Sequence, residues 1–193
     1  MSDQVGRIEV VFETHSITVD NEEGRATGWW PGRLSGQGRA LAARLGERRR
    51  ADGIAAVFSS DLTRAAETAL VAFGASGIPV LLDWRLRECD YGKRNGMPVA
   101  ELHANRRDHL DRAYPGGESW RQAVERVGLF LNDLPLRWDG QRVLVIGHVA
   151  TRWALDHFLG GVPLEDLMAE DFAWQEGWEY RLTSFPCTQN PPG

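Results

Sequence analysis

The sequence has little cysteine, no long apolar run and no excess of positive charge. Its two cysteines, Cys89 and Cys187, are too few for a disulfide framework, so a reducing compartment is the simpler assumption. No segment approaches the roughly 18 consecutive apolar residues that a membrane span requires. The first residues have neither the basic start nor the apolar stretch of a signal peptide. We therefore expect a soluble, cytoplasmic protein.

The charge and the length limit the partners and the number of domains. A net charge of −5 and a pI of about 5.6 argue against a broad surface for nucleic acid or an anionic membrane, because both need dense positive charge. We expect neither partner. A chain of 193 residues can bury one core, which predicts a single domain over 1–193 with a flexible, proline-containing tail at 186–193. A homodimer is compatible with the sequence.

Short apolar runs alternate with helical patterns along the chain. The segment between residues 20 and 35 is rich in Gly, Pro, Asp and Asn and predicts a long loop. The expected strands are residues 8–12, 54–58, 78–82, 142–146 and 178–183. The expected helices are residues 36–51, a helix that follows the capping residues 59–61 and runs to about 73, two patterns between 97 and 135, and about 150–159. This alternation predicts an α/β fold: a three-layer sandwich with a mostly parallel central sheet, helices on both faces and a helical cover over about 93–136.

Four of these apolar runs end in, or lead into, polar clusters that contain chemically useful side chains. His15, Arg64, Glu88 and His148 lie in these clusters. In open parallel sheets, ligands bind outside the carboxyl ends of the strands. We therefore expect the four side chains to share one pocket.

The four side chains suit phosphoryl transfer through a phosphohistidine. His15 attacks phosphorus, Arg64 and a protonated His148 neutralise the phosphoryl oxygens, and Glu88 protonates the departing alkoxide. Neither a metal ion nor another cofactor is needed. Further hydrogen bonds to phosphate could come from three short polar side chains: Thr18, Asn21 and Thr27.

Each residue also has a structural interpretation. His15 can cap a strand end, Arg64 can be a surface arginine, Glu88 a solvated loop charge and His148 a partly buried histidine. Their joint position at one sheet edge favours the functional interpretation. Cys89 is interpreted as a small filler, and the remaining histidines and the tryptophans mainly as surface or packing residues. A metal hydrolase that uses the two histidines and nearby carboxylates remains an alternative.

Several motifs resemble the histidine phosphatase superfamily, the phosphoglycerate mutase-like proteins, over nearly the whole chain. These are SSDLTRAAET from Ser59, LRECDYG from Leu86, VIGH from Val145 and ATGWWPGRLSGQGRALAARLG from Ala26, in the family's order. The resemblance implies that His15 is the phosphorylated nucleophile, that Arg64 and His148 bind the phosphoryl group, and that Glu88 is the proton donor.

The first motif departs from that family. The family usually has arginine, histidine and glycine in sequence, whereas this chain has Thr14, His15 and Ser16. One guanidinium is therefore missing from the expected phosphate site, and Arg25 and Arg152 are candidate substitutes. The departure predicts either a slow enzyme or a rebuilt site for a different substrate.

We expect a metal-independent phosphatase that acts on a small phosphomonoester. A mutase is disfavoured because the sequence lacks the longer insertions of the mutases that it resembles. A repurposed member of the family that binds an anionic ligand is the other alternative, and Thr14 is the reason to consider it.

Overall fold

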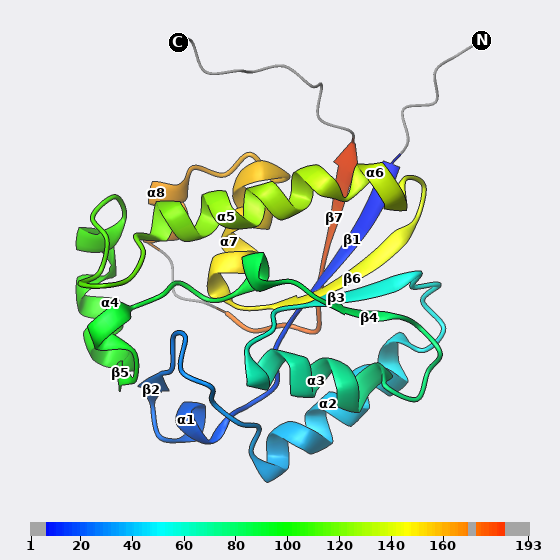
Figure 1. Ribbon diagram of the computed structural model, residues 1–193, viewed down its shortest axis with the longest axis horizontal. Coiled ribbons are helices and arrows are strands. Elements are labelled where there is room, and N and C mark those ends of the chain that lie inside the picture. Colours follow the sequence, from blue (N-terminus) through cyan, green and yellow to red (C-terminus); the bar gives the residue numbers. More distant parts are fainter. Residues whose placement is uncertain (1–6, 170–172, 184–193) are drawn as a thin grey trace.

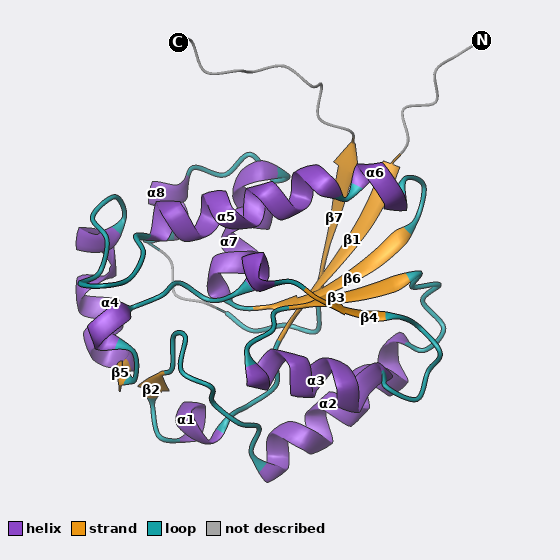
Figure 2. Ribbon diagram, viewed as in Figure 1, coloured by secondary structure: helices purple, strands orange, loops and turns teal. Residues whose placement is uncertain are grey.

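A five-stranded sheet forms the middle layer of the protein (Figures 1 and 2). The structure is a computed structural model that describes residues 7–169 and 173–183. The strand order is β4-β3-β6-β1-β7; all neighbours are parallel except β7, which runs antiparallel to β1. The strands are β1 (Arg7–Thr14), β3 (Ala56–Ser59), β4 (Val80–Leu82), β6 (Arg142–Gly147) and β7 (Trp178–Thr183). The expected mostly parallel sheet is thus confirmed, and the apolar β6 lies at its centre.

The three inner strands β3, β6 and β1 are buried on both faces, because each of them contains consecutive apolar residues rather than alternating ones. In β1, Val10 and Phe12 belong to one core cluster, and Val11 between them belongs to the other. In β6, Val145 and Ile146 divide between the two clusters in the same way. This pattern requires a helical layer on each side.

Two helices cover each face of the sheet (Figure 2). The helices α2 (Gly36–Arg49) and α3 (Thr63–Phe73) pack against each other on one side, and α5 (Trp120–Asp133) packs on α7 (Val149–Phe158) on the other. Ser35 caps α2 and Ser119 caps α5 through their hydroxyl groups. Two short helices complete the second layer: α6 (Pro135–Trp138) and α8 (Leu164–Leu167).

The loop after His15 differs from the sequence expectation. The expected loop between residues 20 and 35 contains most of α1 (Val19–Glu22) and β2 (Arg25–Ala26). The segment Val19–Glu22 is helical because Thr18 and Asn21 form a capping box. The helix α3 begins at Thr63 with Arg64 in its first turn, as expected, and Ser60 accepts the amide of Leu62 just before it.

The remaining short elements form one end of the molecule, beyond the sheet (Figure 1). Here β2 pairs with β5, and α4 follows at once. The elements at this end include η2 (Gly92–Arg94), β5 (Met97–Pro98), α4 (Val99–Asn105) and η3 (Arg106–His109), whereas η1 (Trp84–Leu86) packs against α5. Of the expected helical cover over 93–136, α4 and η3 lie at this end, whereas α5 belongs to the layer on the sheet.

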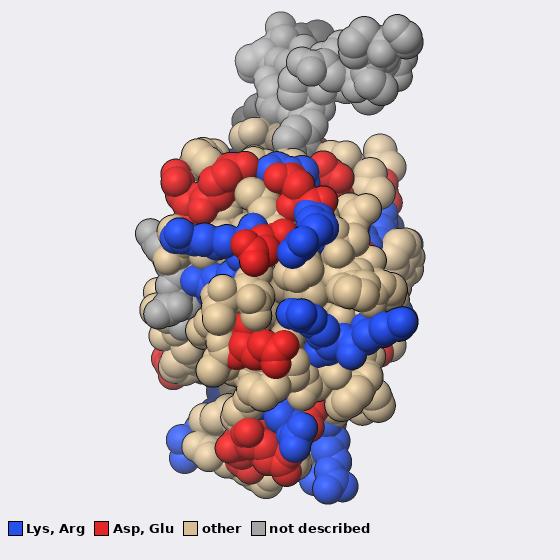
Figure 3. All heavy atoms as spheres, turned by 90° about the vertical axis from the view of Figure 1, so that its left-hand side faces the viewer, with Lys and Arg blue, Asp and Glu red and all other residues tan. Residues whose placement is uncertain are grey.

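The surface at this end carries both signs of charge. Figure 3 shows Lys and Arg side chains interspersed with Asp and Glu side chains rather than one extended basic area. Within residues 7–169 and 173–183, no helix has the length and apolar character needed to cross a bilayer. The expected flexible tail at 186–193, with Cys187, lies outside the described residues.

Candidate active site

Strand register brings the two histidines together. The strands β1 and β6 run in parallel, and Thr14 pairs with Gly147 at their ends. The next residue in each strand is a histidine, His15 or His148. The amide of His15 donates to the carbonyl of Gly147 over 3.0 Å, and the two imidazole rings are 5.0 Å apart between centroids. Residues 133 positions apart therefore meet because of strand pairing.

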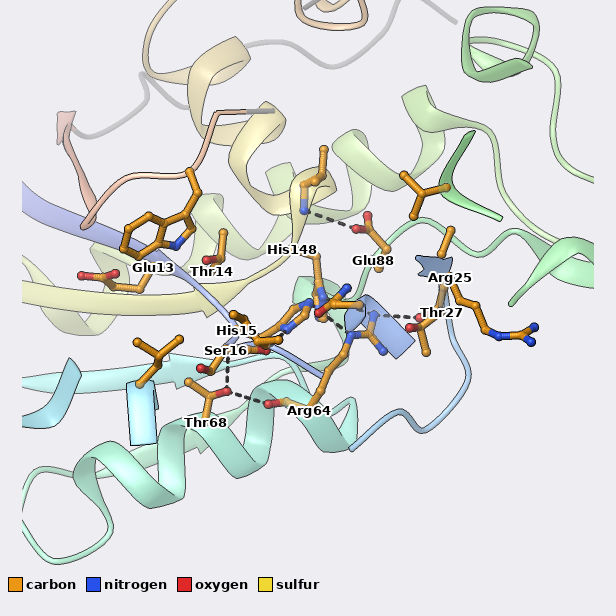
Figure 4. A pocket seen from close by; sticks show the side chains of 18 of the residues that line it. Glu13, Thr14, His15, Ser16, Arg25, Thr27, Arg64, Thr68, Glu88 and His148 are labelled. Atoms are coloured by element: carbon orange, nitrogen blue, oxygen red, sulfur yellow. Dashed lines mark hydrogen bonds between the residues drawn. The ribbon is translucent and has the colours of Figure 1, made fainter. Parts of the chain in front are cut away.

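Arg64 lies between the two imidazoles (Figure 4). It is in the first turn of α3, and its side chain is buried. Its Nε donates to Nε2 of His15 and one terminal nitrogen donates to Nδ1 of His148, each over 3.3 Å. The same guanidinium donates to the carbonyls of Gly28 and Trp30 over 2.8 and 3.2 Å. All four acceptors of these hydrogen bonds are neutral, so no direct ion pair among the described residues cancels the positive charge of Arg64.

The hydrogen bonds of His15 leave Nε2 as its basic nitrogen. Its Nδ1 lies 2.8 Å from the carbonyl oxygen of Ser16, which can only accept, so Nδ1 carries the proton. Nε2 then holds a lone pair. Burial first, and the charge of Arg64 second, lower the pKa of His15 to about 3. The imidazole is therefore neutral, as a nucleophile must be, over nearly the whole pH range of a folded protein.

His148 is a buried neutral donor in the described structure. Its Nδ1 accepts from Arg64, which places the proton on Nε2, and this buried Nε2 has no hydrogen-bond partner among the described residues. Burial, followed by Arg64 and His15, lowers the pKa of His148 well below 6.5. The expectation of a protonated His148 therefore does not hold for the free protein. A substrate oxygen that accepts from Nε2 would satisfy the donor.

Glu88 is held at the start of α7. Its two carboxyl oxygens accept from the backbone amides of Cys89, Val149 and Ala150 over 2.9, 3.3 and 3.1 Å. Burial raises the pKa of Glu88, and the amide bonds and the charge of Arg64 oppose this shift only in part. A buried carboxyl group with a raised pKa is suited to donate a proton.

Several residues that position these groups were not identified from the sequence. Thr68 accepts the amide of Ser16 and donates to the carbonyl of Arg64, which joins the nucleophile loop to α3. Trp29 and Arg126 both donate to the carbonyl of Glu88, over 2.6 and 3.2 Å. Thr68 is four residues after Arg64, and this helical spacing is a signal that could have identified it.

The three predicted short polar side chains have different positions. Asn21 and Thr27 line the cavity described below, but Thr27 donates to Asp20 over 2.9 Å and Asn21 serves the capping box. Thr18 is fully buried, caps α1 and does not line the cavity. The structure thus gives Thr18 a positioning role in the loop after His15 rather than a contact with a ligand.

The candidate substitutes for a second guanidinium also separate. Arg25 lines the cavity, where its guanidinium pairs with Glu23 over 3.1 Å at an exposed position. Arg152 pairs with Asp156 over 2.7 Å and lies 4.4 Å from the ring centre of Trp178, and it does not line the cavity. Of the two, only Arg25 is placed to approach a ligand.

A cavity of about 720 Å³ surrounds His15, and Thr14, Arg64, Glu88 and His148 also line it. Its size is typical of a site for a small molecule. His103, expected to be a packing or surface residue, lines it as well, as do Trp120, Trp153 and Trp174. The tryptophans were interpreted mainly as packing residues, and these three are also walls of the cavity.

The competing chemistries lack support among the described residues. Burial raises the pKa of the Cys89 thiol well above its ordinary value, which disfavours a thiolate nucleophile. Within residues 7–169 and 173–183, no three His, Cys, Asp or Glu side chains are grouped closely enough to hold a metal ion. A metal hydrolase therefore has no ligand set in that part of the chain.

Comparison with known proteins agrees with this geometry. The family model of the histidine phosphatase superfamily (branch 1) matches residues 11–174, which include all four side chains of the site. The chain belongs to the histidine phosphatase superfamily. The resemblance expected from the motifs is thus confirmed.

Relatives in the superfamily include both mutases and phosphatases. A probable phosphoglycerate mutase, GpmB of Salmonella typhi, is 32% identical over 81% of this chain and 76% of its own. The solved structure of YhfR from Bacillus stearothermophilus has a TM-score of 0.76 at 28% identity and covers 88% of each chain. A mycobacterial glucosyl-3-phosphoglycerate phosphatase has a TM-score of 0.71 at 26% identity and covers 84% of each chain. The names of GpmB and of the mycobacterial protein both describe enzymes that act on phosphate esters.

Proposed function

We propose that the chain is a metal-independent phosphatase that hydrolyses a small phosphomonoester through a phosphohistidine. The observation that carries this proposal is the contact of Arg64 with both imidazoles, beside a Nε2 of His15 that bears a lone pair. A nucleophile and a bound cation then face the same phosphorus atom. The two cysteines and the lack of a membrane-spanning helix in the described part of the chain support a cytoplasmic location.

The first step transfers the phosphoryl group to the protein. Nε2 of His15 attacks phosphorus, while Arg64 and Nε2–H of His148 donate to the phosphoryl oxygens. The bond from phosphorus to the ester oxygen breaks, and the departing alkoxide takes the proton of Glu88. In-line displacement places that leaving group opposite His15, toward Glu88.

The second step returns the free protein. The carboxylate of Glu88 takes a proton from water as the water oxygen attacks phosphorus. The N–P bond breaks, its electron pair returns to Nε2 of His15, and phosphate is released. Both steps use only side chains of this chain and water.

Turnover of p-nitrophenyl phosphate in EDTA tests the proposal. We expect His15→Ala to abolish turnover, because the other imidazole of the site, His148, has its lone-pair nitrogen Nδ1 on Arg64 and presents only an N–H to the phosphoryl group. His157→Ala is the matched control: His157 lies outside the cavity, where its Nδ1 donates to the carbonyl of Val162, and this variant should retain the rate. Turnover that persists in His15→Ala would show that the nucleophile is wrongly assigned.

A mutase is the second candidate, because GpmB of Salmonella typhi carries that name. A mutase must return the phosphoryl group to the substrate and exclude water from the phosphohistidine. Incubation with 3-phosphoglycerate separates the two functions: a phosphatase releases inorganic phosphate, whereas a mutase forms 2-phosphoglycerate faster than it releases phosphate.

A further inference from the structure

The cavity continues past His15 on the side away from Glu88. In Figure 4, Glu13 and Thr14 lie on one side of His15, and Glu88, Arg25 and Thr27 lie on the other. The part on the first side, called the Thr14 lobe here, is lined by Thr14, Leu41, Ala42, Leu45 and Trp174. The two-step phosphatase reaction places nothing in this lobe.

The Thr14 lobe has apolar walls and a charged rim. Leu41, Ala42 and Leu45 come from the inner face of α2, and Trp174 lies in the segment before β7. At the rim, Arg48 donates to Glu13 over 3.0 Å and forms an ion pair with Glu176 at 3.6 Å. The second rim arginine, Arg44, is exposed to solvent. The walls of the lobe are apolar and suit a flat, uncharged group.

In-line geometry decides which part of a substrate can enter the Thr14 lobe. The leaving group must depart opposite Nε2 of His15, and therefore toward Glu88. The lobe begins at Thr14, immediately beside His15, so a leaving group cannot reach it. Only a substituent that stays on phosphorus during the attack, in an equatorial position, can extend into the lobe.

The charge at the reacting position is also low. Arg64 is the only cation in contact with the two imidazoles among the described residues, and the low pKa values of His15 and His148 keep both rings neutral. Thr14 contributes a hydroxyl beside them where a second cation would be needed to balance a dianion. One guanidinium and one imidazole N–H match two phosphoryl oxygens that share a single negative charge.

We propose that the Thr14 lobe holds the second ester group of a phosphodiester, and that the site cleaves such monoanionic diesters in addition to monoesters. The inference rests on the proposed phosphohistidine chemistry. Its new content is the substrate class, a diester with one flat, apolar ester group.

The reaction balances without any further reactant. Nε2 of His15 attacks phosphorus, the bond to the leaving oxygen breaks, and Glu88 protonates that oxygen, while the second ester group remains on phosphorus in the Thr14 lobe. Water, deprotonated by the Glu88 carboxylate, then attacks phosphorus. The N–P bond breaks, its electron pair returns to Nε2, and a phosphomonoester is released.

Two chromogenic substrates test the inference: p-nitrophenyl phosphate, a monoester, and bis(p-nitrophenyl) phosphate, a diester. In EDTA we expect the kcat/KM for the diester to exceed that for the monoester, and turnover of the diester to be lost in His15→Ala. Early in the reaction, ³¹P NMR should show p-nitrophenyl phosphate as the product. Release of inorganic phosphate without this intermediate would overturn the inference.

Two substitutions, one inside the lobe and one at its entrance, should both lower the turnover of the diester relative to that of the monoester. Leu41→Trp fills the lobe and should lower the kcat/KM for the diester at least about tenfold relative to the monoester. Thr14→Arg adds a guanidinium and blocks the entrance, so it should raise the monoester rate about tenfold or more while it lowers the diester rate. Ala43→Trp, on the exposed side of α2 outside the cavity, is the control and should change neither rate.

The outcomes separate this inference from the proposed function. Turnover of the monoester alone, dependent on His15, overturns the inference and leaves the phosphatase. An equal loss of both activities in Leu41→Trp also overturns it. Turnover of neither substrate overturns the inference and the proposed function together, and diester cleavage that survives in His15→Ala assigns that activity to another group.

Discussion

At the scale of single residues, the environments of Glu88 and His15 separate an acid from a nucleophile. Glu88 is buried and His15 is half-buried, and the surrounding protein disfavours the charged form of each. For a carboxyl group this raises the pKa, and for an imidazole it lowers the pKa, so the same physical cause yields a protonated acid and an unprotonated nucleophile.

These shifts predict the pH profile of the reaction. The acid limb of kcat/KM should lie near pH 3, where His15 takes up a proton, and the basic limb should lie above 4.5, where Glu88 loses its proton. Glu88→Gln keeps the shape but cannot donate a proton, so it should lower kcat by about 10² to 10⁴ and remove the basic limb. The profile is measured with p-nitrophenyl phosphate and corrected for ionisation of the substrate. A basic limb unchanged in Glu88→Gln would exclude Glu88 as the acid.

At the scale of elements, α2 packs directly on the backbone of the nucleophile loop. A methyl group at Gly38 would overlap the carbonyl oxygen of Ile17, two residues after His15. Gly38→Ala should therefore displace this loop, lower kcat and destabilise the fold by about 1 to 3 kcal/mol. The value of kcat and the free energy of unfolding in urea are the two measurements.

Gly36→Ala is the matched control for Gly38→Ala. Both glycines lie in the first turn of α2, but a methyl group at Gly36 meets no atom within 4 Å. This variant should be neutral or stabilise the protein by up to about 1 kcal/mol, because alanine favours the helix over glycine. An equal decrease of kcat and of unfolding free energy in the two variants would show that the contact of residue 38 with Ile17 does not cause the effect of Gly38→Ala.

The helix α5 holds the loop that carries Glu88. Its Arg126 pairs with both carboxyl oxygens of Glu118, each over 2.8 Å, and donates to the carbonyls of Arg85 and Glu88. Arg126→Met removes the only ion-pair partner of Glu118 among the described residues, together with the donor to the Arg85 carbonyl, and should cost about 3 to 5 kcal/mol of unfolding free energy. Arg121→Met removes more exposed ion pairs from the same helix and should cost at most about 1 kcal/mol. Urea unfolding of the two variants and of the unchanged protein measures both free-energy differences.

The sequence predicted the sheet elements better than the connections, for a physical reason. Apolar runs such as residues 142–146 identify a buried strand locally, because burial on both faces leaves no polar position. The short helix α1 depends on the capping box of Thr18 and Asn21 within a polar segment, where many turns have similar composition. The placement of α5 on the sheet depends on its contact with α7, which no local pattern contains.

The side chains of the site were predictable where each one follows a strand or begins a helix. His15 and His148 follow strand ends, and Arg64 is in the first turn of α3. The protonation of His148 was not predictable, because it follows from burial and from Arg64 across the sheet. The Thr14 lobe was equally hidden, since its walls on α2 and near Trp174 come together only in the folded chain.

At the scale of the whole molecule, the buried neutral histidines make the fold sensitive to acid. The folded-state pKa of His15 is about 3, and that of His148 is also well below 6.5. Between pH 6.5 and 4.5 the unfolded chain therefore binds protons that the folded chain does not, and the unfolding free energy falls as the pH falls. Each group contributes up to about 1.4 kcal/mol per pH unit.

His15→Asn tests this dependence, because asparagine does not titrate. Urea unfolding at several pH values between 6.5 and 4.5 should give a shallower decrease of stability in the variant than in the unchanged protein. Identical slopes would show that His15 takes up its proton equally well in the folded and the unfolded chain.

The central position of β6 has a consequence for synthesis on the ribosome. This strand comes after β1 and β3 in the chain, yet it lies between them in the sheet. Until residue 147 has emerged, β1 and β3 lack the strand with which both of them pair in the finished sheet, and their free edges are open to other chains. The same strand delivers His148, so the enzyme acquires its second histidine only when those edges close.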